Sequence, residues 1–440
     1  MKEKGIILPI FSLPSKYGIG DFGNEAFEFI DILSDNNIDY WEILPINACN
    51  RLPYAPISYY ALDENYISLD KLKEAGLIHN AEIRESKSRV IYDNYKEKYY
   101  REAFKNFNKN EEYYQFIKCE EINEYAEYEK DLYGVDTEYS LFLQYILYKQ
   151  WKDLKKYANS KGVKIIGDMP MYPAFESAET KYHPDYFEME NGKFTFEAGT
   201  PPDYFSSTGQ KWGTPVYNVE KIKNDNYDYL IKRFKYHLDL YDKIRIDHFL
   251  GYDEFFKIPI GKFGTAGFYS DGLGYGFFDK LFENKRIKVD SFIVEDLGDI
   301  RDETIRLRDH YGFTGQRIIQ STIDLEKLCD DNDLFENIMI MPGNHDCHTI
   351  KGWYDSLNEN HQNNLKIFLK NNGCVCENIN VGILQYCFKC KAKIVMVMVQ
   401  DILELDDNAR INVPGIDFDD NWSWKLENFE SFREKLNIFK

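Results

Sequence analysis

Residues 241–249 read YDKIRIDHF, a short and mostly apolar strand whose last residues suddenly become charged. The strand proper is Lys243 to Ile246, and Arg245, Asp247 and His248 stand at or just beyond its end. Charged groups are costly to bury unless they are paired with opposite charges or hydrogen-bond partners. We therefore interpret this strand end as the rim of a functional site.

Other strand ends carry the same signature. Residues 291–294 (SFIV) run into Glu295, residues 337–341 (NIMIM) run into the loop with Asp346, and residues 163–167 run into Asp168. Buried-looking strands that each end in a carboxylate favour carboxylate chemistry at one end of a parallel β/α fold.

The whole chain divides into eight apolar strands separated by helical periodicity. The predicted strands are residues 4–11, 39–46, 163–167, 243–246, 292–294, 317–322, 338–341 and 394–399, and the clearest helices are 24–36, 140–159, 226–240, 302–310 and 380–391. This order predicts an α/β protein, a closed (β/α)₈ TIM barrel in which residues 1–440 form a single catalytic domain.

Two large insertions interrupt the predicted barrel, one after strand two and one after strand three. Residues 47–160 are charged, rich in Tyr and mainly helical in pattern. Residues 172–221 are rich in Gly, Pro and aromatic residues and look structureless. A long stretch of that kind inside a compact domain is usually functional, so we expect it to include a loop that covers the substrate.

Composition excludes several classes of function. The 440 residues include 54 basic and 74 acidic side chains, and the net charge of −20 argues against binding to nucleic acid or to an anionic membrane. No apolar run approaches the ~20 residues that span a bilayer, and no targeting segment is visible, so we expect a cytoplasmic protein. The 34 Tyr and 31 Phe fit either a compositional bias or aromatic rings that stack on sugars.

The cysteines offer one competing hypothesis. Cys374, Cys376, Cys387 and Cys390 have a spacing that a zinc tetrad could use. However, residues 380–391 have a helical pattern leading into a strand, so Cys387 and Cys390 fit equally as reduced thiols packed on the sheet. A divalent metal held by the strand-end acids is a further alternative, but no metal-ligand spacing is visible. We expect no metal and no cofactor.

The strand-end residues suggest glycoside chemistry. The carboxyl ends of barrel strands meet at one mouth, which would bring Asp168, Asp247, Glu295 and Asp346 together. Two carboxyls about 5–5.5 Å apart cleave glycosides with retention, one as nucleophile and the other as acid/base. Arg245 shares a face with Asp247, because strand residues two apart point the same way, and would keep that carboxylate ionised. The alternative is a set of structural ion pairs in a barrel mouth.

Glu295 is the expected proton donor of the group. It stands beside Asp296 in a shielded position, where desolvation and a like charge would raise the pKa of its carboxyl. Asp346, next to His345, would hold sugar hydroxyls while the ring flattens towards an oxocarbenium ion.

These residues lie in motifs that resemble the amylomaltase family, also called 4-α-glucanotransferases or disproportionating enzymes, which are distant relatives of the α-amylases. The matching stretches span nearly the whole chain in the family's order: residues 13–23, 41–45, 167–170, 201–212, 245–249, 295–298, 343–346, 352–353, 408–415 and 421–424.

The resemblance implies a retaining transglycosylase with Asp247 as nucleophile, Glu295 as acid/base and Asp346 as stabiliser of the transition state. It implies malto-oligosaccharides or glycogen-type glucans as substrates. It also implies a set of substrate-binding residues, some at the cleavage point and some in a mobile loop over the glucan: Tyr54, Asp168, Asp203, Tyr204, Phe205, Trp212, Arg245, His248 and His345. Covering the glycosyl-enzyme from water would favour a sugar acceptor.

The chain departs from the family pattern at a few positions without losing a catalytic carboxylate. Leu250 stands for the usual Arg, Glu42 for Gln, Thr214 for Asn, and Cys347-His348 for Asn-Asp. Two other functions remain open at this point: an α-1,4-glucan hydrolase with the same residues and a wetter site, or a catalytically dead glucan-binding protein.

Overall fold

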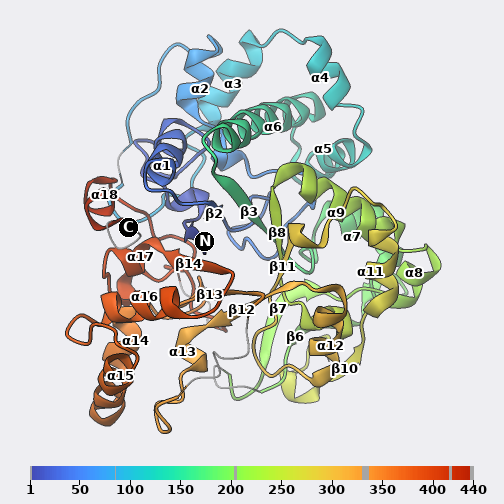
Figure 1. Cartoon of the computed structure of the whole chain (residues 1–440). Coiled ribbons are helices and arrows are strands. Elements are labelled where there is room, and N and C mark those ends of the chain that lie inside the picture. Colours follow the sequence, from blue (N-terminus) through green and yellow to red (C-terminus); the bar gives the residue numbers. More distant parts are fainter. Residues whose placement is uncertain (1, 85, 203–205, 330–335, 416–418, 437–440) are drawn as a thin grey trace.

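The computed structural model describes residues 2–84, 86–202, 206–329, 336–415 and 419–436 (Figure 1). Its centre is a closed barrel of eight parallel strands in the order β1-β14-β13-β12-β11-β8-β3-β2. The strands are β1 (Glu3–Ile7), β2 (Tyr40–Glu42), β3 (Lys164–Met169), β8 (Lys243–Ile246), β11 (Phe292–Val294), β12 (Thr314–Ile318), β13 (Ile338–Met341) and β14 (Ile394–Met398). The predicted (β/α)₈ barrel is confirmed.

Strand register decides which side chains enter the barrel mouth. Asp168 on β3 pairs with Arg245 on β8, and Ile246 pairs with Val294 on β11. Parallel partners point to the same face, so Arg245 shares the interior with Asp168, and Glu295 with Asp247. Gly167 faces outwards, where an added Cβ would lie 2.2 Å from the ring of Tyr241, so there is no room for a side chain at this position of β3.

Helices surround the barrel as the periodicity predicts (Figure 1). The main ones are α1 (Asn24–Asp35), α6 (Thr137–Ser160), α9 (Asp228–Leu240), α12 (Asp302–Tyr311), α14 (Ile350–Ser356), α15 (Glu359–Asn371) and α16 (Ile379–Lys389). Cys387 lies fully buried in α16, and Cys390 directly follows that helix. Within the described parts of the chain, no group of three or more His, Cys, Asp or Glu side chains could hold a metal ion.

The segment 47–160 carries the helices α2 (Leu69–Glu74), α3 (Glu97–Asn106), α4 (Glu111–Phe116) and α5 (Glu120–Tyr133) before it returns through α6 (Figure 1, top). Its aromatic residues pack against one another: Phe107 contacts Tyr113, Phe142 and Tyr145 at centroid distances of 5.0–5.6 Å. These rings form a core, so the high aromatic content of this segment serves packing.

The prediction that residues 172–221 lack structure is wrong. The segment contains α7 (Ala178–Tyr182), β4 (Met189–Glu190), β5 (Lys193–Phe194), β6 (Phe196–Thr200), β7 (Gln210–Pro215) and α8 (Val219–Asn224). β6 pairs with β7 and also with β9 (Glu254–Pro259), which in turn pairs with β10 (Phe268–Asp271). Because β9 and β10 come from beyond the fourth barrel strand, the partner that stabilises β6 is not visible in the local pattern.

The sixth barrel strand also lies earlier than predicted. β12 is Thr314–Ile318, and residues predicted as its end form the short helix α13 (Ile319–Thr322). Pairing of Gly315 with Ile338, and of Thr314 with Ile293, sets this register. Apolar residues alone therefore did not locate the strand.

In the described residues, no helix is both long enough and apolar enough to cross a membrane.

Candidate active site

An open cleft of about 1830 Å³ lies over the carboxyl ends of the barrel strands. Asp247, Glu295 and Asp346 line it, although each comes from a different strand end. Four further predicted residues line the same cleft: Tyr54, Trp212, His248 and His345. Of the predicted loop residues, Asp203, Tyr204 and Phe205 lie outside the described residues. The sequence motifs thus meet in one place, as the barrel topology requires.

Arg245 contacts three carboxyl groups of the site. Its Nη1 donates hydrogen bonds to both carboxylate oxygens of Asp168 at 2.8 Å and to Asp247 Oδ1 at 2.9 Å. Its Nη2 lies 2.8 Å from Glu295 Oε1. Arg245 is 2% exposed and Asp168 0%, so both lie below the floor of the cleft, not in its lining. One buried cation therefore holds three carboxyl groups in position.

Asp247 and Glu295 both contact the Arg245 guanidinium, and their carboxyl groups differ in pKa. Burial raises the pKa of Asp247 to about 6, against the opposing effect of Arg245. Burial raises the pKa of Glu295 to about 7, with Asp247 adding to the rise. Near neutral pH the pair thus favours an ionised Asp247 beside a protonated Glu295, the protonation states that a nucleophile and an acid need.

The like charge that acts on Glu295 is not the one expected. Asp296 points away from the cleft, where its carboxylate accepts hydrogen bonds from Arg308 at 2.5 Å and Arg317 at 3.0 Å. Successive residues of an extended chain face opposite sides, so the neighbour in sequence is the wrong partner. Asp247 and Asp346 provide the negative charge instead.

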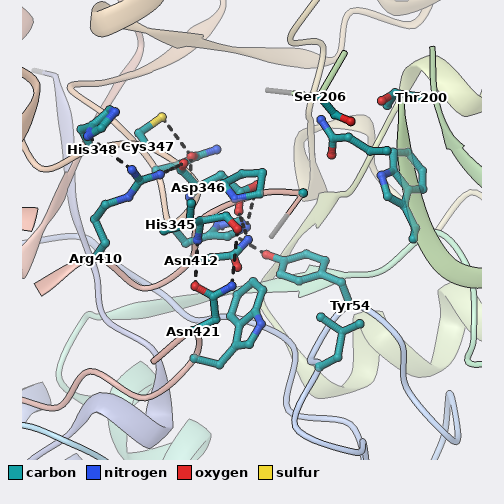
Figure 2. A pocket seen from close by; sticks show the side chains of 18 of the residues that line it. Tyr54, Thr200, Ser206, His345, Asp346, Cys347, His348, Arg410, Asn412 and Asn421 are labelled. Atoms are coloured by element: carbon teal, nitrogen blue, oxygen red, sulfur yellow. Dashed lines mark hydrogen bonds and ion pairs between the residues drawn. The ribbon is translucent and has the colours of Figure 1, made fainter. Parts of the chain in front are cut away.

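Asp346 is held by a segment near the C-terminus that carried no predicted site residue. Asn412 Nδ2 donates to Asp346 Oδ1 at 2.6 Å, and Arg410 Nη2 donates to the Asp346 carbonyl at 2.9 Å (Figure 2). The backbone N–H of Asn412 also bonds the carbonyl of His345 at 3.0 Å. Arg410 and Asn412 both lie in the stretch 408–415, and the match of that stretch to the family pattern is the sequence signal that could have identified them.

Aromatic and imidazole rings form the walls around the carboxylates. The rings of Tyr54 and His345 stack with centroids 5.0 Å apart, and Tyr54 donates to Asp168 Oδ2 at 2.6 Å. Trp212 meets His248 edge-on at 4.7 Å. His248 adopts a left-handed backbone (φ 48°), and its N–H donates to Glu295 Oε2 at 2.7 Å. This turn therefore links Glu295 to the strand end that carries Asp247.

Two departures from the family pattern, Glu42 and His348, lie close to this arrangement. Glu42, at the end of β2, is buried, and burial raises the pKa of its carboxyl to about 8. His348 Nδ1 lies 2.5 Å from Asp407 Oδ2 and 3.3 Å from Arg410 Nη1. Each of these groups has a partner or a neutral form that suits its surroundings, so the carboxylate trio remains intact.

Comparisons with known proteins agree with this geometry. A family model described as 4-alpha-glucanotransferase matches residues 8–133 and 124–431. The 4-alpha-glucanotransferase of Aquifex aeolicus (strain VF5) is 33% identical over 484 residues, covering 100% of this chain and 98% of the relative. That of Clostridium butyricum is 33% identical over 470 residues, covering 95% of each chain.

A solved structure agrees as well. The structure described as amylomaltase from Streptococcus agalactiae in complex with acarbose superposes with a TM-score of 0.92 at 28% identity, covering 100% of this chain and 98% of that one. The alignment runs through the barrel and through the segments inserted in it. On sequence and on structure, the chain belongs to the 4-alpha-glucanotransferase family.

Proposed function

We propose that this chain transfers α-1,4-linked glucosyl segments between malto-oligosaccharides or glycogen-type glucans, with retention of configuration. One observation carries the proposal: Arg245 anchors Asp247 and Glu295 side by side in the cleft. Two carboxyl groups that contact the same guanidinium favour the close spacing of a retaining enzyme, about 5–5.5 Å, over the ~6.5–9.5 Å at which an inverting enzyme holds a water between its acids.

In the first step, Glu295 gives its proton to the oxygen of the scissile bond. The bond between C1 and that oxygen breaks, the shortened glucan leaves as an alcohol, and C1 bonds to a carboxylate oxygen of Asp247. Arg245 keeps Asp247 ionised until it attacks and then balances the charge that moves to Glu295. The raised pKa of Glu295 makes the proton available at neutral pH.

In the second step, the 4-hydroxyl of an incoming glucan replaces the leaving group. Glu295, now ionised, takes its proton while the oxygen attacks C1 and the ester to Asp247 breaks. Two inversions at C1 return the α configuration. Asp346, oriented by Asn412, faces the sugar ring while positive charge develops on it, which is the role of a transition-state stabiliser.

The activity is tested with maltotriose as the sole substrate and product analysis by chain length. A ladder of longer malto-oligosaccharides together with glucose supports transfer. Glucose and maltose without longer products would mean hydrolysis, and binding without any product would mean a dead glucan-binding protein.

The roles are tested by Asp247→Ala, Glu295→Gln and Asp346→Asn. Each variant should lose several orders of magnitude in kcat, because each removes a group that acts on the reacting atoms. Near-normal turnover in any of them would overturn its role.

We also propose that the protein works in the cytoplasm. All eight of its cysteines are free thiols, which suits a reducing compartment. Fractionation of the source cells, with activity followed in each fraction, tests this location.

A further inference from the structure

Phe263 is the most exposed large hydrophobic side chain among the described residues, with 70% of its surface accessible. Isolated apolar residues on a protein surface are common and need no explanation. Phe263, however, belongs to the lining of the active-site cleft. It lies in the turn after β9, which belongs to the four-stranded sheet β10-β9-β6-β7. The three carboxyl groups, in contrast, follow strands of the barrel.

The turn that presents Phe263 is built to stay in place. Gly264 packs against Gly209 so closely that a Cβ on Gly264 would lie 2.8 Å from the Cα of Gly209 and 2.7 Å from the carbonyl oxygen of Thr208. A Cβ on Gly209 would lie 2.6 Å from the carbonyl oxygen of Thr200. Two backbones thus touch without side chains between them, as the glycines at both positions allow.

Hydrogen bonds close the same turn. The N–H of Ala266 bonds the carbonyl of Phe263 at 2.9 Å, and the N–H of Lys262 bonds that of Pro259 at 3.0 Å. The backbone on both sides of Phe263 is therefore held, while its ring stays in solvent at the edge of the cleft. A fixed backbone with an exposed ring loses little freedom when a ligand covers the ring.

We propose that Phe263 is a remote platform for linear α-glucans, on which a glucosyl ring stacks while the chain reaches into the site at Asp247. This inference rests on the proposed function and adds a preference for long chains. The C–H faces of a glucosyl ring are apolar, so they match an exposed aromatic ring, whereas the hydroxyl groups at the ring edges stay in water.

The same sheet offers a matched control. Phe268, on β10, is 46% exposed, but it does not line the cleft. Its ring contacts Phe196 at 5.6 Å, so its removal disturbs the sheet at least as much as removal of Phe263. Any effect of general damage to the sheet would appear in Phe268→Ala.

The test compares maltoheptaose with maltotriose as substrates for the wild type, Phe263→Ala, Phe263→Trp and Phe268→Ala. We expect Phe263→Ala to lower the ratio of kcat/KM for maltoheptaose to that for maltotriose about 3- to 10-fold, mainly through KM. Phe263→Trp should keep the ratio of the wild type, since it retains an aromatic face, and so should Phe268→Ala.

Two results would overturn the inference: an unchanged ratio in Phe263→Ala, or an equal fall in Phe268→Ala. Both leave the proposed function standing if the wild type still makes longer products from maltotriose. Failure of the wild type to transfer would instead reject the proposed function itself, so the two failures can be told apart.

Discussion

At the scale of single residues, the site depends on one buried guanidinium. Arg245 is 2% exposed and contacts Asp168, Asp247 and Glu295, so one positive charge faces three carboxyl groups. The three cannot all be ionised without leaving negative charge unbalanced in a shielded site. The structure therefore keeps a proton among them, and Glu295, with the higher pKa of the cleft pair, is its holder.

This charge arrangement predicts a narrow pH optimum. Asp247 must be ionised to attack, so activity falls as the pH drops through about 6. Glu295 must be protonated to act as an acid, so activity falls as the pH rises through about 7. A profile of kcat/KM against pH should be bell-shaped, and its two limbs belong to the coupled pair.

The loss of kcat/KM on both sides of the optimum should come from titration of Asp247 and Glu295 and not from unfolding of the protein. Thermal unfolding at each pH is the control, because the protein must remain folded across the range. A profile that stays flat from pH 5 to 9 would contradict the assigned roles.

Asn412 should be required for turnover although it is not one of the three acids. Asn412→Ala removes the hydrogen bond to Asp346 Oδ1, and bonds to charged groups contribute about 1.5–3 kcal/mol. We expect kcat for maltotriose to fall about 10- to 100-fold with a smaller change in KM. A variant that loses thermal stability but keeps its kcat would show that Asn412 only holds the chain segment.

At the scale of elements, α6 joins the helical insertion to the barrel. It runs from Thr137 to Ser160, and its buried side chains include Phe142 and Tyr145 on the insertion side and Trp151, whose indole N–H donates to the Leu240 carbonyl at 3.0 Å. Directly after it, Gly162 adopts φ 81° and leads the chain into β3. The helix thus carries the chain from the insertion to the strand that ends in Asp168.

The N-terminus of α6 offers a test of this element. Asp136 accepts a hydrogen bond from the N–H of Tyr139 at 3.0 Å, and loss of such a cap costs about 1 kcal/mol. Asp136→Ala should lower the thermal midpoint. The matched change Asp153→Ala removes an exposed Asp from the interior of the same helix. It should not lower the thermal midpoint, because Ala favours helix interiors. Equal effects of the two changes would contradict the cap.

At the scale of the whole molecule, several carboxyl groups other than those of Asp247 and Glu295 are buried. Burial raises the pKa of Glu42 and Glu64 to about 8, of Glu179 and Asp401 to about 7, and of Asp63 to about 6. These carboxyl groups therefore bind more protons in the folded protein than in the unfolded chain between about pH 4.5 and pH 8. The net charge of −20 adds self-repulsion in the same direction.

Stability should accordingly fall as the pH rises. A raised carboxyl pKa contributes stability that is present at low pH and is lost as the pH passes through the pKa of the folded state. We expect the thermal midpoint to decrease from pH 5.5 to pH 8.5. Glu42→Gln, which resembles the protonated carboxyl in shape, should make the decrease smaller; a midpoint that rises over this range would contradict the prediction.

Much of the barrel could be read from local sequence. Four of its strands, β8, β11, β13 and β14, lie within one residue of their predicted bounds, because each is a compact apolar run with a polar end. β12 lies earlier than the apolar pattern predicts, and that pattern does not predict β9 and β10. Their pairing depends on partners distant in the chain, and no local pattern carries that information.

In the candidate site, too, some residues could be predicted from local sequence and others depend on partners distant in the chain. The carboxylates could be found because a charged residue after a buried strand is conspicuous. Asn412 could not be given a contact, since it lies 66 residues after Asp346 in an irregular segment. Asp296, by contrast, directly follows Glu295 in the sequence, but strand alternation turns its carboxylate towards Arg308 and Arg317.

By itself, the sequence determined the eight strands as a set, the fold class and the three acids at the strand ends, since hydrophobic runs and their polar ends are local properties. Only the tertiary structure decided which charges meet: that Arg245 balances Asp168, Asp247 and Glu295 together, and that Asp296 does not join them. Barrel closure and strand register set these contacts, and they also raise the pKa of Glu295 by removing it from water. Electrostatic interactions act through space, so their partners are defined only once the chain has folded.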